Sequence, residues 1–409
     1  MEKWPLRDLS QLGSIGRGRS RHRPRNAPHL YGGRHPLIQT ADIMKSEFYI
    51  SNYSQTYSDD GLAQSKLWNP NTLCITNAGA NTGESAILSF HACFPDSIIG
   101  FVADEGKADV RYVKYFLDSI IHKIKSITRG ATQDNLSMEK LLSFKMPTPP
   151  LPVQQKIASV LYSIDKEIQN LKDRVEIRET IAQNLFDEWF EKLHHPNIKP
   201  TTFVESELGP VPSEWSVKYL SEYVEFERGV EPGSKSYSEV EKPGFIRFLR
   251  VGDLSERRSH TYVPIGLTKG KSVKVNDILI SLDGTVGIVK TGYSGCFSTG
   301  LRKCKIVKDE ISMPFLYFTL KSKNIQSTIL AHASGATILH ASSSIKFMKF
   351  VLPPKYLIEQ FTDFTRPLFQ LYYLDNRRIE LLRDMRDLLR LKLFSGEIDV
   401  SNLDIEVIV

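Results

Sequence analysis

The sequence repeats itself at a nearly constant offset, and this repeat constrains the fold more than any other feature. Five residues near the start recur 211 positions later (215 − 4 = 211): Trp4, Leu9, Ser10, Arg17 and Gly18 return as Trp215, Leu220, Ser221, Arg228 and Gly229. Residues 41–43 resemble 252–254 at the same offset. Farther along, 71–79 match 276–284 (276 − 71 = 205), 93–94 match 296–297 (296 − 93 = 203) and 130–132 match 335–337. So many matches in one order predict a tandem duplication.

Length and composition suit a protein with several globular domains. The chain has 409 residues, of which 41% are hydrophobic and 24% are charged, as is ordinary for soluble proteins of two or three domains. It has no apolar run of about 18 residues, and its first residues lack the apolar core of a signal peptide. The sequence therefore predicts a cytoplasmic chain with no membrane partner. Its four cysteines show no CxxC spacing and are expected to be buried, reduced thiols.

Each half divides into a globular part and a helical part. The globular parts contain short β-like runs separated by Gly, Asn, Asp and Ser, at residues 72–76, 86–90, 245–251, 277–282 and 286–290. Prolines mark their ends at 146–152 and 352–354. Apolar residues with coiled-coil spacing follow the first boundary, namely Ile157, Leu161, Ile164, Ile168, Leu171 and Val175. The stripe after the second is Phe361, Phe364, Leu368, Leu371, Ile379, Leu382, Met385, Leu389 and Leu393.

The predicted fold class is α+β, with two mixed α/β domains separated by two long antiparallel coiled-coil helices and related by an internal pseudo-two-fold repeat. The predicted parts are a first domain at 1–150, a helix at 151–195, a linker and second domain at 196–355, and a second helix with a C-terminal tail at 356–409. Neither helix can bury its stripe alone, so we expect the two helices to pack together. Such a rod would suit two half-sites on DNA, whose helical repeat is about 34 Å.

In this order of parts the chain resembles the specificity (S) subunit of type I restriction-modification enzymes over nearly its whole length. The resemblance rests on the paired starts at Trp4 and Trp215, on glycine turns after a central strand, on Pro-Pro boundaries, and on LFSGEI at 393–398. The glycine turns are Gly79, Gly83, Gly284 and Gly287, and the boundaries precede Gln155 and Gln360. The first helix departs from this pattern at its end, where LFDEWF occupies 185–190.

The resemblance implies a non-catalytic adaptor for double-stranded DNA. In that family each target-recognition domain reads one half of an asymmetric bipartite site, and two methyltransferase subunits dock on the helix pair. No cofactor is then expected in this chain. S-adenosylmethionine for adenine N6-methylation would bind the partner subunits, and ATP with magnesium would bind motor-nuclease restriction subunits where these are present.

Two alternatives stay open at this point. Asp96, Glu105 and Lys107 resemble the PD-ExK arrangement of nucleases, in which two acids hold magnesium and a lysine assists attack by water. The repeat disfavours it, because Ser298 and Thr299 follow the matching Cys-Phe pair of the second half. The other alternative is a structural coiled-coil scaffold without DNA specificity. No catalytic residue and no metal site is predicted, since methyltransferase loops and histidine clusters at metal-ligand spacing are missing from the sequence.

The arginine-rich residues 17–34 are the strongest candidates for DNA contact. Arginine bridges phosphates and pairs with guanine O6 and N7. The segment contains prolines and no apolar periodicity, so it is predicted to be an irregular loop rather than a packed element. A solvated loop without a ligand is the alternative. Its counterpart at 230–247 is much less basic, so the two domains should read different sequences and the site should not be palindromic.

Smaller candidate surfaces follow the glycine turns and the Gly-Ala-Thr match. Glycine lets backbone approach phosphate, and the polar side chains there can bond base edges, although a purely structural turn is equally consistent with the pattern. The predicted DNA-contact residues are Arg17, Arg19, Arg21, Arg23, Arg25, Arg34, Thr82, Arg129, Thr132, Gln133, Asn135, Arg228, Lys235, Arg250, Thr285, Thr337, His340 and Ser342.

Overall fold

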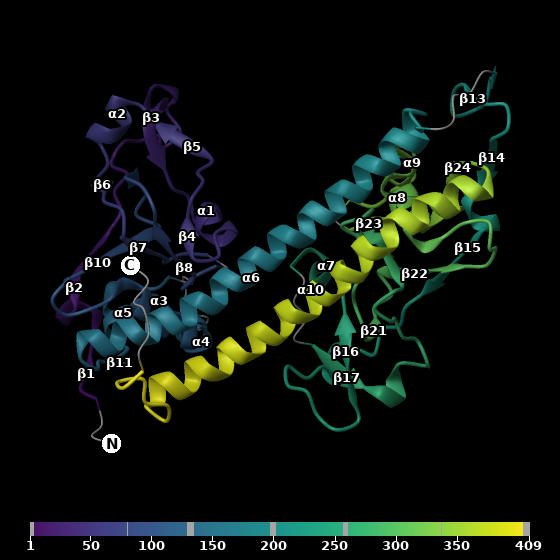
Figure 1. Ribbon diagram of the computed structural model, residues 1–409. Helices are drawn as coiled ribbons and strands as arrows, with labels where there is room; N and C mark the ends of the chain where they lie inside the picture. Colours follow the sequence, from purple (N-terminus) through teal and green to yellow (C-terminus); the bar gives the residue numbers. More distant parts are fainter. Residues whose placement is uncertain are drawn as a thin grey trace. The chain divides into compact units, whose positions relative to one another are not determined.

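A computed structural model of the chain describes residues 4–79, 81–128, 135–196, 202–256, 261–336 and 338–403 (Figure 1). By its internal contacts the chain divides into two units. Unit 1 comprises Met1–Ile168 and Leu381–Val409, and unit 2 comprises Gln169–Glu380. Each unit contains one globular part and a segment of both long helices. Four predicted DNA-contact residues, Arg129, Thr132, Gln133 and Thr337, lie outside the described residues.

Unit 1 is built on two sheets, with the orders β2-β10-β7-β8-β4 and β5-β3-β9-β6. The strands of the first are β2 (Gly13–Arg17), β4 (Tyr49–Ile50), β7 (Leu73–Thr76), β8 (Ser85–Leu88) and β10 (Ile98–Ala103). Those of the second are β3 (Tyr31–Leu37), β5 (Gln55–Tyr57), β6 (Leu67–Trp68) and β9 (Ala92–Cys93), while β1 (Leu6–Arg7) pairs with β11 (Met146–Pro147). β7 and β8 are buried at every position, which fits strands covered on both faces.

Among the described residues, unit 1 has five short α-helices. They are α1 (Thr40–Lys45), α2 (Asp59–Ala63), α3 (Val110–Ser119), α4 (Ile121–Thr128) and α5 (Met138–Ser143). Of these, α1 and α3 pack on the larger sheet and α2 packs on the smaller one. α3 begins at Asp109, whose carboxylate accepts the backbone N–H groups of Arg111 and Tyr112 and so satisfies free donors at the helix start. Tyr112 and Tyr115 of α3 are fully buried, and the long helices add Leu161 and Phe394 to the same core.

Unit 2 contains the sheets β15-β22-β18-β20 and β17-β16-β21 together with three two-stranded pairs, β12-β13, β14-β24 and β19-β23. The strands are β12 (Phe203–Val204), β13 (Val211–Pro212), β14 (Ser216–Tyr219), β15 (Val224–Arg228), β16 (Phe245–Leu249), β17 (Tyr262–Pro264), β18 (Ile278–Ser281), β19 (Asp283–Gly284), β20 (Val289–Lys290), β21 (Cys296–Phe297), β22 (Leu301–Ile306), β23 (Leu339–His340) and β24 (Lys349–Leu352). Its short helices are α7 (Val251–Glu256), α8 (Met313–Lys321) and α9 (Lys323–Ala331).

Equivalent elements of the two units begin at the offsets seen in the sequence. β15 starts 211 residues after β2 (224 − 13 = 211), and β22 starts 203 residues after β10 (301 − 98 = 203). The parallel pairing of Leu37 with Cys93 recurs as that of Phe248 with Cys296. The turns before α1 and α7 are stabilised by the same hydrogen bond. The buried Asp42 carboxylate accepts the N–H three residues earlier at 2.8 Å, and the buried Asp253 carboxylate does the same at 2.7 Å.

The two long helices are α6 (Leu151–Phe186), continued by one π-helical turn (Asp187–Glu191), and α10 (Lys355–Ser395). They run antiparallel (Figure 1). Within unit 2, Arg178 of α6 pairs with Asp375 of α10, and farther along α6 the Phe186 ring lies 5.9 Å from the Phe361 ring. Within unit 1, Asp165 pairs with Arg386 at 2.5 Å.

The predicted apolar stripe is confirmed on α6 but only partly correct on α10. All six heptad residues named for α6 are buried. On α10, Phe361, Ile379 and Leu393 are buried, whereas Phe364, Leu371 and Met385 are exposed. The prediction failed because α10 carries apolar residues on more than one face, and spacing alone does not say which face meets a partner. The exposed large hydrophobic residues of α10, including the three just named, are Tyr356, Phe364, Leu371, Leu374, Leu381, Met385, Leu388 and Leu391.

Two smaller expectations concern the membrane and the cysteines. No helix among the described residues has both the length and the apolar character needed to cross a bilayer. The four cysteines are buried and free, as predicted. Burial raises the pKa of each thiol, most strongly for Cys74 and Cys304.

Candidate nucleic-acid interface

The arginine-rich segment 17–34 is irregular from 18 to 27, as predicted, but it is anchored to the core of unit 1, so the prediction that it is not packed is wrong. Ala27 and Leu30 are buried in a small core with Leu37, Tyr57 and Cys93. A 3-10 turn (Pro28–Leu30) and the start of β3 lie within the segment. Ala27 and Leu30 are enough to anchor the segment, because β5, β9 and α2 supply the rest of this core. These elements come from outside the segment.

Three arginines at the start of this segment alternate with buried residues. Arg17, Arg19 and Arg21 are exposed, whereas Gly18 and Ser20 are buried. A Cβ on Gly18 would lie 2.3 Å from the carbonyl oxygens of Phe94 and Pro95, so glycine is required for this close approach. Alternate side chains of an extended chain point to one side and recur every ~7 Å. Among the described residues, no side-chain hydrogen bond or ion pair engages these three guanidinium groups.

The other three arginines of the segment are engaged with the protein. Arg23 donates from Nη1 to the carbonyl oxygens of Ser20 and His22, both at 2.8 Å. Arg25 pairs with Asp96 at 2.9 Å. Arg34 lies 3.5 Å from Asp59, and a hydrogen bond from His35, followed by the charge of Arg34, lowers the pKa of that carboxyl. These contacts suit side chains that shape the segment.

The backbone between Arg19 and His22 is held by residues that the sequence did not single out. Gln64 Oε1 accepts the N–H groups of Arg21 and His22 at 2.6 and 3.1 Å, and Ser65 Oγ donates to Arg19 O at 2.9 Å. The adjacent Lys66 places Nζ 3.4 Å from the centre of the Trp68 ring. Partial burial, and secondly Arg19, lower the pKa of Lys66. No local pattern marked Gln64 and Ser65, because their partners at 19–22 lie more than 40 residues away in the sequence.

In unit 2 the structure brings together two predicted surfaces that are far apart in the sequence. β19 pairs with β23, and His340 Nδ1 lies 2.8 Å from Asp283 Oδ1. Exposed Thr285 follows β19 directly. In unit 1, Asn135, which is exposed, bridges to Ala78 at the equivalent place (283 − 205 = 78; 340 − 205 = 135). His340 in unit 2 and Asn135 in unit 1 therefore lie beside the glycine turns of their own units.

A buried arginine supports this surface in unit 2. Arg302 of β22 is 5% exposed. It donates to the carbonyl oxygens of Thr299 and Leu301 at 2.5 and 3.0 Å and to the Ser342 hydroxyl at 2.6 Å, while Asp283 lies 3.9 Å away. Burial lowers its pKa. β22 also contains Lys303 and Lys305, so the local sequence did not mark Arg302 as the buried cation of the strand.

The remaining predicted contact residues differ in exposure. Thr82 is buried, and its hydroxyl donates to Gly79 O at 2.7 Å, so its side chain serves its own turn. Arg228 and Lys235 are exposed. Arg250 is about half exposed, with Nε 3.5 Å from Asp253. The Ser342 hydroxyl is occupied by Arg302.

The residues of the nuclease alternative do not form a site. Asp96 and Glu105 flank the two ends of β10, whose six residues span ~20 Å. Asp96 is paired with Arg25, and Lys107 lies 2.5 Å from Asp104. Within the described parts of the chain, no group of three His, Cys, Asp or Glu side chains is arranged to hold a metal ion.

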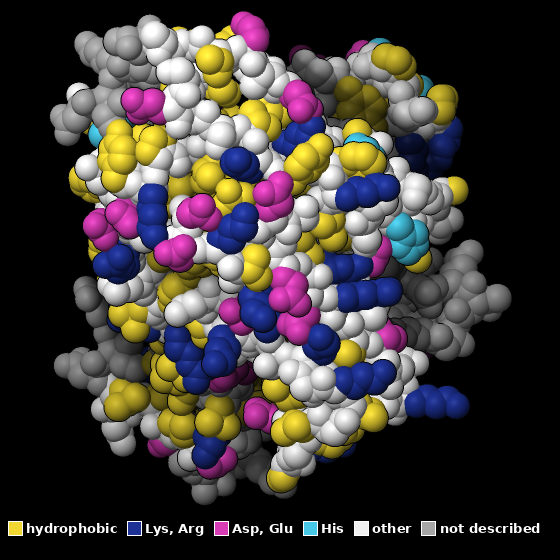
Figure 2. Space-filling model, turned by 90° about the vertical axis from the view of Figure 1, so that its right-hand side faces the viewer, with side chains coloured by type: hydrophobic (Ala, Val, Ile, Leu, Met, Phe, Trp, Pro, Cys, Tyr) yellow, Lys and Arg dark blue, Asp and Glu magenta, His cyan; other side chains and the backbone are white. Residues whose placement is uncertain are grey.

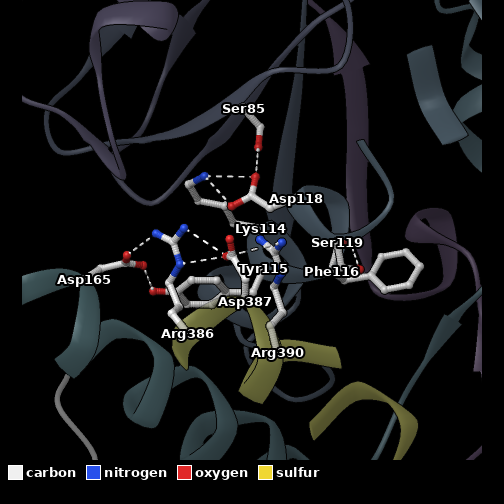
Figure 3. Close-up of polar contacts among 10 residues, drawn as sticks. All are labelled: Ser85, Lys114, Tyr115, Phe116, Asp118, Ser119, Asp165, Arg386, Asp387 and Arg390. Atoms are coloured by element: carbon white, nitrogen blue, oxygen red, sulfur yellow. Dashed lines mark hydrogen bonds and ion pairs between the residues drawn. The ribbon is translucent and has the colours of Figure 1, made fainter. Parts of the chain in front are cut away.

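Polar contacts join the globular part of unit 1 to both long helices (Figure 3). Tyr115 of α3 donates to Asp165 of α6 at 2.6 Å, and Arg386 of α10 donates to the same carboxylate at 2.5 Å. Burial disfavours the charge of Arg386, but Asp165 and Asp387 outweigh burial and raise its pKa. On α3 itself, Lys114 pairs with Asp118 at 3.0 Å. Such a network orients the domain, because every charge in it has a partner.

Charge is mixed on the face shown in Figure 2. Lys and Arg side chains lie among Asp and Glu side chains and exposed hydrophobic ones, without one continuous basic field. The net charge of +6 is therefore not gathered on this face.

Comparison with known proteins gives one consistent result. The family model described as "Type I restriction modification DNA specificity domain" matches residues 1–179 and 212–378. The MjaIX specificity subunit of Methanocaldococcus jannaschii is 24% identical, over 98% of this chain and 94% of that protein. The EcoBI specificity subunit of Escherichia coli is 21% identical, over 89% of this chain and 80% of that protein.

A solved structure shares the fold. The crystal structure of the S subunit of a type I restriction-modification system from M. genitalium superimposes with a TM-score of 0.54, at 19% identity and with 96% of each chain covered. At this identity the likeness concerns the fold alone.

Proposed function

This chain belongs to the type I restriction-modification DNA specificity family, as a specificity subunit, and on that premise we propose that it reads an asymmetric bipartite DNA site. The globular part of each unit reads one half-site, and the chain itself catalyses no reaction. The observation that carries this proposal is a shared strand framework with different side chains at matching positions. Residues 17, 19 and 21 are exposed arginines, whereas the matching residues are an exposed Arg228, a buried Val230 and a half-buried Pro232.

We further propose that two methyltransferase subunits dock on the long helices. The exposed apolar residues of α10 support this, because Leu371, Leu374, Leu381, Met385 and Leu388 would otherwise face water. In the cytoplasm these partners would bring S-adenosylmethionine for adenine N6-methylation. Restriction subunits, where present, would bring the ATP- and magnesium-dependent cleavage.

The test is to express the chain with its methyltransferase subunits in a host without adenine methylation and to sequence single DNA molecules for N6-methyladenine. We expect one asymmetric motif with a gap, present only when the chain and its partners are expressed together. A palindromic or ungapped motif would contradict the proposal. So would cleavage of DNA by the purified chain with magnesium.

A further inference from the structure

We propose that Gln64 and Ser65 are positioning residues for DNA recognition by unit 1. They hold the backbone from Arg19 to His22 so that the Arg19 and Arg21 side chains are presented to the first half-site. This inference rests on the proposed function and adds the device that orients its reading groups.

The anchors lie directly beside the exposed guanidinium groups. Ser65 Oγ bonds the carbonyl oxygen of Arg19, and Gln64 Oε1 bonds the N–H of Arg21 at 2.6 Å. The N–H of Arg19 is also held, by Phe94 O at 3.0 Å. Both backbones are therefore tied to unit 1, while in the described structure their side chains engage no protein group. A reading group is built this way when the main chain is rigid and the side chain stays available to a ligand.

The geometry has a consequence for binding. Ordering a flexible segment costs conformational entropy, and a segment that orders only on the DNA weakens association by that amount. Anchoring the backbone beforehand avoids this loss. It also limits where a guanidinium can reach, so a bidentate contact to guanine is offered in one register.

Gln64 holds the backbone through the oxygen of its side-chain amide. Its Nε2 is buried without a hydrogen-bond partner among the described residues, whereas Oε1 accepts two backbone N–H groups. A carboxylate at this position would keep the acceptor and remove the unsatisfied donor. Gln64→Glu is therefore a conservative replacement, and Gln64→Met, which is similar in length, removes the acceptor.

The equivalent backbone of unit 2 is held differently. The first anchor recurs, since Val230 N–H donates to Phe297 O at 2.9 Å. Beyond it, Glu231 accepts from Gly233 N–H at 3.1 Å and from the Tyr237 hydroxyl at 2.7 Å, all within the same segment. The Gln64–Ser65 anchor therefore belongs to unit 1, and its loss should affect one half-site.

The experiment uses the full chain in complex with its methyltransferase subunits and measures binding to duplexes with single base changes in either half-site. For Gln64→Met we expect discrimination at the first half-site to fall about tenfold, with the second half-site and the salt dependence unchanged. Gln64→Glu should keep wild-type discrimination at the first half-site, although its negative charge beside the arginines should weaken overall binding. Arg21→Gln is the matched contrast, because it removes a cation from the DNA together with the reading group and should also reduce the salt slope by about 1.

Three results would overturn the inference. They are unchanged first-half-site discrimination in Gln64→Met, equal losses at both half-sites, and failure of Gln64→Glu to restore discrimination in a folded complex. If Gln64→Met does not fold, Ser65→Ala removes one anchor alone and is judged by the same criteria. Absence of any bipartite preference in the wild-type complex would instead contradict the proposed function.

Discussion

The residues that follow β2 in unit 1 and β15 in unit 2 occupy matching places but carry different chemistry. The path of the backbone is alike, because a Cβ on Gly18 or Gly229 would lie 2.2–2.3 Å from two backbone carbonyl oxygens. The side chains at these positions are not alike. Arg17, Arg19 and Arg21 are all exposed in unit 1, whereas in unit 2 Arg228 is exposed, Pro232 is half-buried and Val230 is buried in a small core. A duplicated framework can thus keep its glycine contacts while the same position faces solvent in one unit and the core in the other.

The neighbouring strands show the same divergence in charge. In unit 2, Glu227 of β15 pairs with Lys271 and Lys303 at 2.8 and 3.0 Å, and these lysines, Lys271 first, lower its pKa. β2 of unit 1 contains no acid, so Arg17 at its end has no counterion on its own strand. Unit 1 therefore offers uncompensated positive charge where unit 2 offers paired charge.

Removing that positive charge should give the largest effect. The triple variant Arg17→Gln, Arg19→Gln, Arg21→Gln should weaken binding of the partner complex to its site by about 100-fold, and the salt slope should fall by about 2–3, because each phosphate contact contributes ~0.9. Fluorescence anisotropy over a salt series measures both. Arg23→Gln is the control and should barely change the slope, since Arg23 bonds its own segment. If Arg228→Gln alone weakened binding and lowered the salt slope as much, the two units would not differ in their use of positive charge.

A smaller effect is expected from the buried arginine of unit 2. Arg302→Met leaves the Ser342 hydroxyl and the carbonyl oxygens of Thr299 and Leu301 without their donor, and should lower the free energy of unfolding by about 2–3 kcal/mol. Urea unfolding measures this loss. At the equivalent position of unit 1 (302 − 203 = 99), Ile99→Met conserves volume in an apolar site and should cost under about 1.5 kcal/mol. Similar losses in both variants would show that Arg302 does not hold its loop.

The smallest effect concerns acid. The hydrogen bond from Lys145, followed by that from Ser10, lowers the pKa of Asp8 from 3.8 to about 2. A carboxyl whose folded pKa is depressed contributes stability above its unfolded pKa, and this contribution disappears as the pH falls from about 4 to about 2. Unit 2 has Tyr219 at this position (219 − 8 = 211), with Lys349 over its ring at 4.8 Å.

Asp8→Asn should therefore cost about 0.5 kcal/mol at pH 7, as is usual for a pair near the surface. Urea unfolding of wild type and variant at several pH values should show the two converging near pH 2. A difference that persists unchanged at that pH would mean that the Lys145 pair is not its source.

Local pattern predicted most of the framework. Residues 277–282 lie in an apolar run between turn residues, and the structure has β18 there; the heptad residues of α6 are all buried. What pattern missed depends on contacts between distant segments. Gln64 anchors Arg21 across 43 residues, and His340 meets Asp283 across 57. No local spacing encodes such pairs, and for the same reason the packing of Ala27 and Leu30 was not foreseen.

The Phe394 ring, near the end of α10, lies 4.8 Å from Tyr112 and 6.0 Å from Phe116 in the core of unit 1. The ribosome must therefore add 282 residues (394 − 112 = 282) after Tyr112 before this core can close. At ~5–20 residues per second, that is a delay of tens of seconds. During it the aromatic side of α3 has no Phe394 to cover it, and the emerging chain presents an apolar surface to chaperones and to other nascent chains. The globular part of unit 1 is therefore synthesised first, but its core is completed only after α10 has been synthesised.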